Sequence, residues 1–416
     1  MTGQCFARLV AIVLLLVACG SKLAVAQANH NVDALLRQIA EHDRMGKHAE
    51  ATPLVEQVVS EVEKAVGRRH AKYVDALSFL SSHYAIIGRH ADAESKARAA
   101  LALRREIVGS AHVDFAKNLA QLASVLGASK KYGESESIWQ QAISTHMVAV
   151  GAQDATVANY LRELALQYAV QAKYIEAVPL LKDAIQIISR KTSGGDPKLA
   201  ELFVDLARSE ISLHKHEDAR ITLRRGRELI QASAGTESLV YARLLSEESR
   251  LTSLPEAETL TKQALAIFTN TLGSEAQETV ISLAALGIII AMQGRYAEAH
   301  PLQLRALEIR ERTLGPDHYD TAESLLNVAG SFANQDKLDL AIEYQKRSLA
   351  AYKRHWGDTH PNVAFALQKL GWFLWQTGEH DQAHEEWSKR FASSRSERRL
   401  TARHLLTFLN SSHQAF

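Results

Sequence analysis

Cysteine is almost absent from this chain, since its 416 residues include only Cys5 and Cys19. Both lie close to the N-terminus, so no disulfide can join distant parts of the body of the protein. An excess of one charge is absent as well, because 48 Lys and Arg residues are balanced by 47 Asp and Glu residues. The formal net charge of +1 gives no general attraction for nucleic acid or for an anionic membrane surface. We therefore predict that the protein binds no nucleic acid.

Motifs that carry catalysis are also missing. The sequence contains no Gly-rich phosphate loop, no serine nucleophile elbow and no HExxH helix. Histidine is abundant, with 18 residues, and His380 and His384 are spaced to share one face of a helix. A zinc site needs a third and usually a fourth ligand, and the spacing supplies none. We predict no catalytic residue, no cofactor and no metal site.

An uninterrupted apolar run occupies residues 9–18, directly after Arg8. This run is too short to span a bilayer but has the length of a signal-peptide core, so we expect an exported bacterial protein. Residues 16–19, Leu-Val-Ala-Cys, resemble a lipobox in which Cys19 becomes the lipidated first residue, whereas residues 24–26, Ala-Val-Ala, fit an ordinary A-x-A cleavage site. The signal peptide is then 1–18 or 1–26. The mature protein is expected to be periplasmic or anchored to the outer membrane, with a lipid at Cys19 as its one membrane contact.

What the chain does contain is a repeat. One column of small residues, which we call the anchor column, divides it into nine units, with neighbouring members 42 residues apart seven times and 38 apart once. A fixed period in this range indicates stacked units that bury their apolar faces against one another. The anchor column consists of Ala51, Ala93, Ser135, Ala177, Ala219, Ala257, Ala299, Ala341 and Ala383.

Three more columns keep this register and predict a helical hairpin in each unit. A large apolar residue precedes the anchor, a small residue follows it by seven positions where two helices approach closely, and a glycine follows it by sixteen positions as a helix stop. Between the glycines, apolar residues recur at spacings of three and four, as in an amphipathic helix. The columns are Leu77, Leu119, Leu161, Phe203, Leu245, Leu283, Leu325 and Leu367; Ala100, Ala142, Ala184, Gly226, Ala264, Ala306 and Ser348; and Gly67, Gly109, Gly151, Gly235, Gly273, Gly315 and Gly357.

The single short spacing marks one unusual unit. Gly235 still follows Ala219 by sixteen positions, so the four missing residues lie between Gly235 and Ala257. Four residues are about one helical turn. We predict that the first helix of this unit, residues 237–250, ends a turn early and leaves a tight connection to the second helix.

Several segments resemble the tetratricopeptide repeat in its 42-residue, kinesin-light-chain-like form. They are residues 294–310, GRYAEAHPLQLRALEIR, residues 314–318, LGPDH, and residues 357–364, GDTHPNVA. The resemblance extends over about residues 30–395. It implies an all-α, right-handed superhelical solenoid of about nine helical hairpins, followed by a capping helix and tail at 396–416. Such repeats serve as scaffolds for many unrelated partners, so the resemblance implies binding and no enzyme activity.

The first helices of such repeats line the partner-binding face, and the candidate site residues lie there. In the kinesin-light-chain-like form an Asn on this face contacts the backbone of a bound peptide, and only Asn327 keeps that residue. The matching column instead holds an acidic run, Glu163, Asp205 and Glu247, that would attract a basic segment of a partner, unless arginines three positions further on neutralise two of its members. The whole column is Phe79, Gln121, Glu163, Asp205, Glu247, Ala285, Asn327 and Lys369.

Tryptophan is concentrated in the last unit, where Trp372 and Trp375 are further candidates. Trp356 and Trp387 lie in the same unit, and Trp139 is the only other tryptophan of the chain. Terminal repeats differ from the rest because nothing stacks beyond them. These residues therefore predict either a cap packed under residues 396–409 or an aromatic patch that binds a partner.

Together these features predict a non-catalytic scaffold or adaptor of the cell envelope that binds a protein or peptide segment along the first-helix face. The alternative is a module that recognises a peptide or glycan ligand in that groove. The candidate partner-binding residues are Gln121, Glu163, Asp205, Glu247, Asn327, Lys369, Trp372 and Trp375, and the candidate lipidation site is Cys19.

Overall fold

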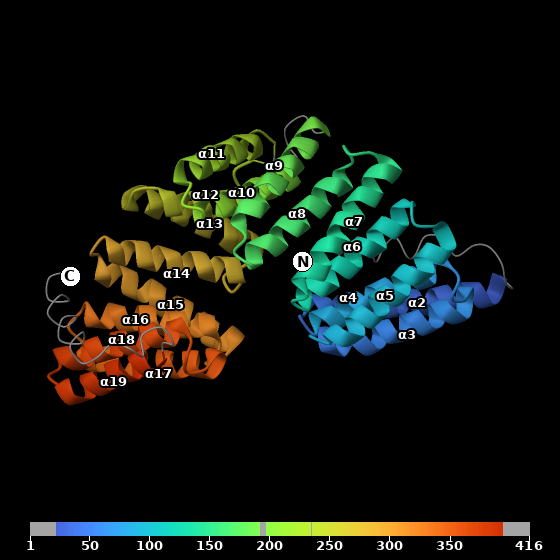
Figure 1. Cartoon of the computed structure of the whole chain (residues 1–416). Helices are drawn as coiled ribbons and strands as arrows, with labels where there is room; N and C mark the ends of the chain where they lie inside the picture. Colours follow the sequence, from blue (N-terminus) through green and yellow to red (C-terminus); the bar gives the residue numbers. More distant parts are fainter. Residues whose placement is uncertain (1–21, 192–196, 234, 394–416) are drawn as a thin grey trace. The chain divides into compact units, whose positions relative to one another are not determined.

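The computed structural model describes residues 22–191, 197–233 and 235–393. These residues form eighteen α-helices and one short 3-10 helix, and no strand occurs among them. The chain divides into two compact units between Thr222 and Leu223. The predicted all-α architecture of repeated helical hairpins is confirmed (Figure 1).

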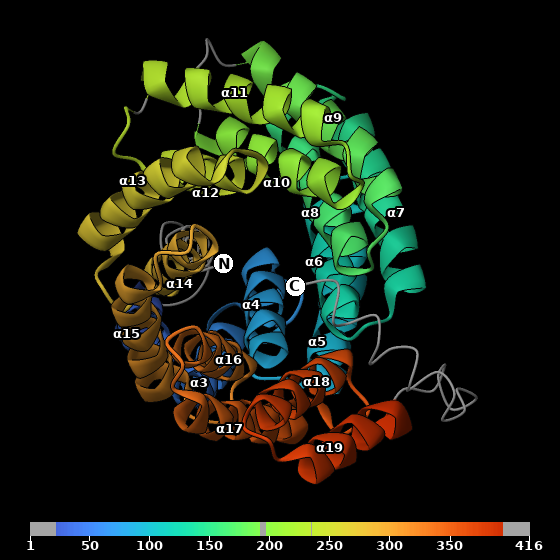
Figure 2. The ribbon, with the colours of Figure 1, turned by 90° about the vertical axis from the view of Figure 1, so that its left-hand side faces the viewer.

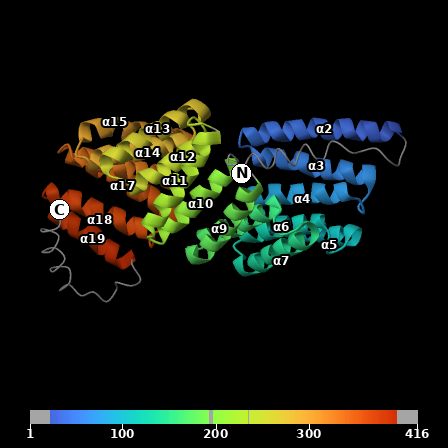
Figure 3. The ribbon, with the colours of Figure 1, turned by 90° about the horizontal axis from the view of Figure 1, so that it is seen from above.

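In the first unit, the first and second helices of successive hairpins alternate along the chain. They are α2 (Lys22–Arg44), α3 (His48–Val66), α4 (Ala71–Ile86), α5 (His90–Val108), α6 (Val113–Ala128), α7 (Tyr132–Val150), α8 (Ala155–Val170), α9 (Tyr174–Lys191) and α10 (Pro197–Ser212). Even-numbered helices are the first helices of the hairpins, and consecutive helices lie side by side in a stack (Figure 3). The division between the units falls inside α11 (His216–Ser233).

The second unit repeats the same arrangement. Its helices are α12 (Leu239–Glu248), α13 (Leu254–Leu272), α14 (Gln277–Met292), α15 (Tyr296–Leu314), α16 (Tyr319–Ala333), α17 (Leu338–Trp356), α18 (Pro361–Gln376) and α19 (His380–Ser393). Figure 2 shows α14, α16 and α18 in one layer and α15, α17 and α19 in the other. Each first helix after α12 packs against the second helix of its own hairpin and against the second helix of the hairpin before it.

The anchor column lies at the centre of each hairpin. All nine of its members are at most 2% exposed, so each first helix approaches its second helix closely at that point. Where serine replaces alanine, its hydroxyl is satisfied by the first helix of the same hairpin. Ser135 Oγ donates to the carbonyl of Ala123 at 2.6 Å. Ser348, seven positions after Ala341, donates to the carbonyl of Ala322 at 2.7 Å. A buried hydroxyl with such a partner avoids the cost of an unpaired polar group.

Left-handed backbone conformations end the helices at both turns of the repeat. The predicted helix-stop glycines have φ between 75° and 111°. The turn inside the hairpin also requires a positive φ, and glycine supplies it at Gly46, Gly88, Gly294 and Gly378. In four other hairpins the same position, with φ between 57° and 60°, is occupied by Lys130, Ala172, His214 and Asp336. A residue other than glycine costs about 1–2 kcal/mol in this conformation.

Histidines cap four of the first helices. In each case the imidazole Nδ1 accepts a hydrogen bond of 3.1–3.2 Å from the backbone N–H two residues later, which would otherwise lack an intrahelical partner. Asp154 does the same for α8 with its carboxylate, at 2.8 Å. The four histidines are His70, His112, His318 and His360.

The predicted short first helix is confirmed. α12 has 10 residues, whereas α14 and α18 have 16 each. It continues into a 3-10 turn, Ser249–Leu251, and α13 begins at Leu254. The missing turn is therefore lost at the C-terminal end of the first helix, as the short spacing predicts.

Both ends of the chain carry predictions that the structure leaves open. Cys19, the apolar run at 9–18 and the expected capping segment at 396–416 lie outside the described residues. α2 begins at Lys22, so the A-x-A pattern at residues 24–26 falls within this helix. None of the described helices combines the length and the hydropathy needed to cross a membrane.

Candidate functional site

Gln121 holds two successive first helices together. It is half-buried on α6, and its Nε2 donates to Ser82 Oγ of α4 at 2.8 Å. This bond joins neighbouring hairpins, so the amide of Gln121 contributes to stacking within the first unit.

Asp205 is held by an arginine of the preceding first helix. Its Oδ2 accepts a hydrogen bond from Nε of Arg162 at 2.6 Å, and Nη1 of the same guanidinium contacts Glu201 at 2.8 Å. Burial raises the pKa of Asp205, although the charge of Arg162 acts in the opposite direction. Glu163, the neighbour of Arg162 in the chain, is half-buried on α8. Glu163 and Asp205 therefore belong to a cluster of mixed charge around Arg162.

Glu247 pairs with a neighbour in its own unit. Its side chain is buried, and its Oε2 accepts from Nη1 of Arg250 at 3.1 Å. Arg250 is one of the arginines that the sequence placed three positions after the acidic run. Two members of that run are thus buried and paired with arginines of the chain. The partner of Asp205 gave no sequence signal, because 43 residues separate it from Arg162.

The aromatic candidates of the last unit belong largely to its core. Trp372 and Trp375 are half-buried and pack against the buried residues of α16 to α19. The ring centroid of Trp375 lies 4.2 Å from that of His380 and 5.6 Å from that of His384. The two histidines considered for zinc therefore pack on a tryptophan. Within the described ranges no group of three or more side chains is arranged to hold a metal ion.

The two remaining candidates lie on neighbouring first helices of the second unit. Asn327 is half-buried on α16. Lys369 is half-buried on α18, and its Nζ lies 5.7 Å from the ring centroid of Phe365. Both residues share their layer with α14 (Figure 2).

α14 carries a feature that reasoning from the sequence missed. Ile281 and Met292 are 48% and 65% exposed, and Ile288 is half-buried between them. Their spacing places them on one face of the helix. The signal was present, because residues 283–292 contain no polar or charged side chain. Such a helix is expected to be buried all round, yet this face of α14 is exposed.

The same register positions are apolar again on α18 but not on α16, where Glu323 and Asn334 correspond to Ile281 and Met292. Phe365, which follows Ile281 by two repeats, is 46% exposed, and Trp372 follows Ile288 by the same interval. Between them α16 carries Gly330, where a Cβ atom would meet no other atom within 4 Å. The surface is therefore open at its centre. We call it the α14–α18 face, and it consists of Ile281, Ile288, Met292, Phe365 and Trp372.

Comparison with known families identifies the repeat in the second unit. The model of the tetratricopeptide repeat matches residues 248–311, 286–354 and 320–386. No curated protein matches the sequence. The chain thus contains tetratricopeptide repeats, and the matched part includes α14, α16 and α18.

Solved structures share the fold at low sequence identity. The apo form of RapI is 12% identical, with 88% of this chain and 97% of that chain aligned at a TM-score of 0.56. Aspartyl phosphate phosphatase F from Bacillus subtilis is 11% identical over 92% of this chain and 96% of that chain, with a TM-score of 0.51. The repeats of a putative kinesin light chain from Podosopora anserina are 19% identical over 57% of this chain and 95% of that chain, with a TM-score of 0.34.

Proposed function

From the tetratricopeptide repeats of residues 248–386 we propose that this chain is a non-catalytic scaffold that binds a protein partner across the α14–α18 face. The observation that carries the proposal is the exposed apolar side of α14, with Ile281 and Met292 in contact with solvent. Repeats of this kind generally mediate contacts between proteins, and stacking within the matched repeats leaves this face exposed.

The physical basis of binding is the burial of apolar surface. Fully burying an isoleucine, methionine or phenylalanine side chain contributes about 1.5–3 kcal/mol, and large aromatic side chains act as anchors at interfaces. Ile288 and Trp372 stand one repeat before and one repeat after Gly330, on either side of the space above it. An apolar side chain of a partner placed in that space would contact both walls.

The expected partner segment is apolar at its centre. Acidic side chains in the first-helix column would favour a basic segment, but Asp205 and Glu247 are already paired with Arg162 and Arg250. A basic residue of the partner would have to replace those arginines. The proposal therefore assigns the main contact to apolar side chains, with any basic residues at the edge.

We further propose that the partner is a component of the cell envelope. Support comes from the apolar run at residues 9–18 and from the two cleavage patterns that follow it. Localisation of the chain by cell fractionation tests this part by itself, and recovery in the cytoplasmic fraction alone would contradict it.

The binding experiment compares two exposed sites of the same chain. The immobilised chain captures partners from an envelope extract, and the purified partner is then titrated by calorimetry. The double variant Ile281→Asp with Met292→Asp places two charges in the α14–α18 face. Because each charge would have to be desolvated on binding, we expect the Kd to rise at least about tenfold, or about 1.4 kcal/mol. Val170→Asp, at an exposed position 75% accessible at the end of α8, is the control.

The control should bind like the unmodified chain. Equal affinity of the double variant would exclude the α14–α18 face as the contact surface. Failure to recover any partner that binds the purified chain would contradict the scaffold function itself.

A further inference from the structure

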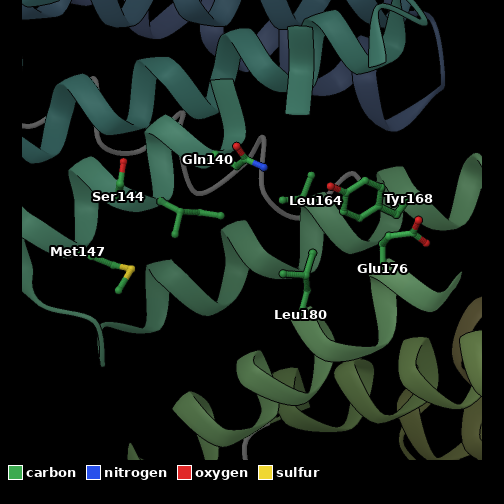
Figure 4. Close-up of a pocket in the computed structure, with 8 residues that line it drawn as sticks. Gln140, Ser144, Met147, Leu164, Tyr168, Glu176 and Leu180 are labelled. Carbon is green, nitrogen blue, oxygen red and sulfur yellow. The ribbon is translucent and has the colours of Figure 1, made fainter. Parts of the chain in front are cut away.

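A groove lies between the second helices α7 and α9 of the first unit. Leu164 and Tyr168 of α8 form its floor, and its walls carry Ile143 and Met147 of α7 and Leu180 of α9 (Figure 4). Its volume is about 330 Å³. Three successive helices thus enclose an apolar space that opens at the surface.

Two other pairs of neighbouring second helices are joined by ion pairs. Arg98 of α5 contacts Glu134 of α7, and Arg347 of α17 contacts Glu311 of α15. Within the described parts of α7 and α9, no ion pair joins these two helices. Met147 stands at the register position that Glu311 has in α15, so an apolar side chain replaces a charged one.

One end of the groove is acidic. Glu176 lies beside Tyr168 (Figure 4), and the hydroxyl of Tyr168 donates to the carboxylate of Glu136. Burial raises the pKa of Tyr168, and the hydrogen bond to Glu136 and the charge of Glu176 act in the same direction. The groove therefore combines an apolar middle with two carboxylates at one end.

A second groove is lined by basic side chains, two of which, Arg347 and Arg354, pair with Glu311 and Asp317. It lies in the second unit, with a volume of about 360 Å³, and its floor includes Leu325 of α16. Lys346, Arg347 and Arg354 of α17 line it. The lining of the second groove therefore offers no carboxylate to a basic segment, whereas the first groove does, and such a segment would distinguish between them.

The chain itself contains a segment with the chemistry that the acidic groove requires. Residues 394–416 lie outside the described structure and include 395–409, in which leucines alternate with basic residues. Only Glu397 is acidic in 395–409. The leucines are Leu400, Leu405, Leu406 and Leu409, and the arginines are Arg395, Arg398, Arg399 and Arg403.

We propose that the groove between α7 and α9 binds this C-terminal segment of a second copy of the chain. The leucines fill the apolar middle, and the arginines pair with Glu136 and Glu176. The groove lined by Lys346, Arg347 and Arg354 has no carboxylate in its lining to pair with the same arginines. This docking is independent of the α14–α18 face, whose residues lie in the other unit.

Cross-linking in the full-length chain tests the proposal. With Cys5 and Cys19 replaced by serine, Ser144→Cys at the groove and Thr407→Cys in the segment supply one reactive pair for a short bismaleimide. We expect an efficient cross-link at dimer mass, and a cross-link at monomer mass alone would contradict docking of a second copy. The control pair combines Thr407→Cys with Lys346→Cys at the cationic groove. Its yield should be at least about fivefold lower, as expected when the favourable pairs are absent.

Charge exchange then separates specific docking from chance contact. Glu136→Arg with Glu176→Arg should lower the Ser144–Thr407 yield about fivefold, and adding Arg398→Glu with Arg399→Glu should restore it. Equal cross-linking yields at the two grooves would overturn the proposal. A Ser144–Thr407 yield that changes with neither set of charge substitutions would also overturn it. So would a higher yield from a pair of Thr407→Cys with Trp375→Cys, which would place the segment as a cap on the last unit.

Discussion

Ala172 shows at the scale of one residue what the sequence could and could not reveal. The hairpin turn was predictable where glycine marks it, as at Gly88 and Gly294. In α8–α9 the same turn has an alanine with φ of 57°, and an alanine gives no turn signal. The register of the neighbouring repeats imposes the left-handed conformation there, so local sequence is overruled by stacking.

Ala172→Gly is therefore expected to stabilise the protein. Removing the unfavourable left-handed conformation of alanine stabilises the folded state by about 1–2 kcal/mol. The greater conformational entropy of glycine in the unfolded chain offsets about 0.4–1 kcal/mol of that gain. We expect a net increase of about 0.5–1 kcal/mol in the free energy of unfolding, measured by urea denaturation. Gly88→Ala is the matched control and should be destabilising. A stability of Ala172→Gly below that of the parent chain would contradict the assignment of strain.

His83 is a second residue whose environment determines its chemistry. Its side chain is fully buried on α4, and neither ring nitrogen has a hydrogen-bond partner among the described residues. The nearest charged group is Asp43, with 3.6 Å between Nε2 and Oδ2. Burial lowers the pKa of His83 below its ordinary value of 6.5, and the charge of His48 acts in the same direction. The charge of Asp43 opposes these two effects but does not cancel them. The folded protein thus favours the neutral imidazole.

This lowered pKa predicts a loss of stability in mild acid. Below about pH 6.5 the unfolded chain binds a proton at His83, whereas the folded chain keeps this imidazole neutral. The contribution of His83 to the free energy of unfolding is therefore complete above about pH 6.5 and is lost as the pH falls toward the pKa of the folded state. The slope is at most about 1.4 kcal/mol per pH unit. Urea denaturation at pH 7.5 and 5.5 should show a larger loss for the parent chain than for His83→Leu. Equal losses in the two proteins would contradict the lowered pKa.

At the scale of one element, the first helices depend on their N-terminal caps. His112 and Asp154 accept a backbone N–H in the same geometry, one with an imidazole nitrogen and the other with a carboxylate. The recurrence of histidine at the N-cap was visible in the sequence. The helix begins at the same register position whether the cap is an imidazole or a carboxylate. Both side chains satisfy the same unpaired donor.

Removal of one such cap should loosen one helix. His112→Ala is expected to cost about 0.5–2 kcal/mol, and His112→Asp should retain the cap because Asp154 performs the same role in α8. Hydrogen exchange at the first turn of α6 measures the effect locally. Exchange that is equally fast in His112→Ala and in the parent chain would show that the cap contributes nothing.

The 42-residue period predicted the elements well because every column has a packing reason. The shortening of α12 followed from counting residues between Gly235 and Ala257, and its 10 residues confirm it. The exposure of α14 could not be predicted in this way. Its apolar residues would be buried in most folds, and only the exposed fractions of Ile281 and Met292 show that one side remains accessible.

At the scale of the whole molecule, the contacts between successive repeats differ from one pair of repeats to the next, because different polar side chains are buried there. Arg104 Nε donates to Asn118 Oδ1 at 2.8 Å, and Arg310 Nη1 donates to Ser324 Oγ at 2.9 Å. His146, at the same register position, contacts Asp154 at 3.0 Å. The periodicity predicts that a side chain at this register position contacts the next first helix, but it does not predict the residue type. The residue type depends on the polar group that the next first helix presents. The surfaces left over from such stacking are the ones available to partners.

The central claim, that a partner binds across the α14–α18 face, is tested most directly by hydrogen exchange on the complex with the partner recovered from the envelope extract. Amides of α14 and α18 should exchange more slowly in the complex than in the free chain, with the rest of the chain less affected. Protection confined to helices of the first unit, or none in α14 and α18, would contradict the account.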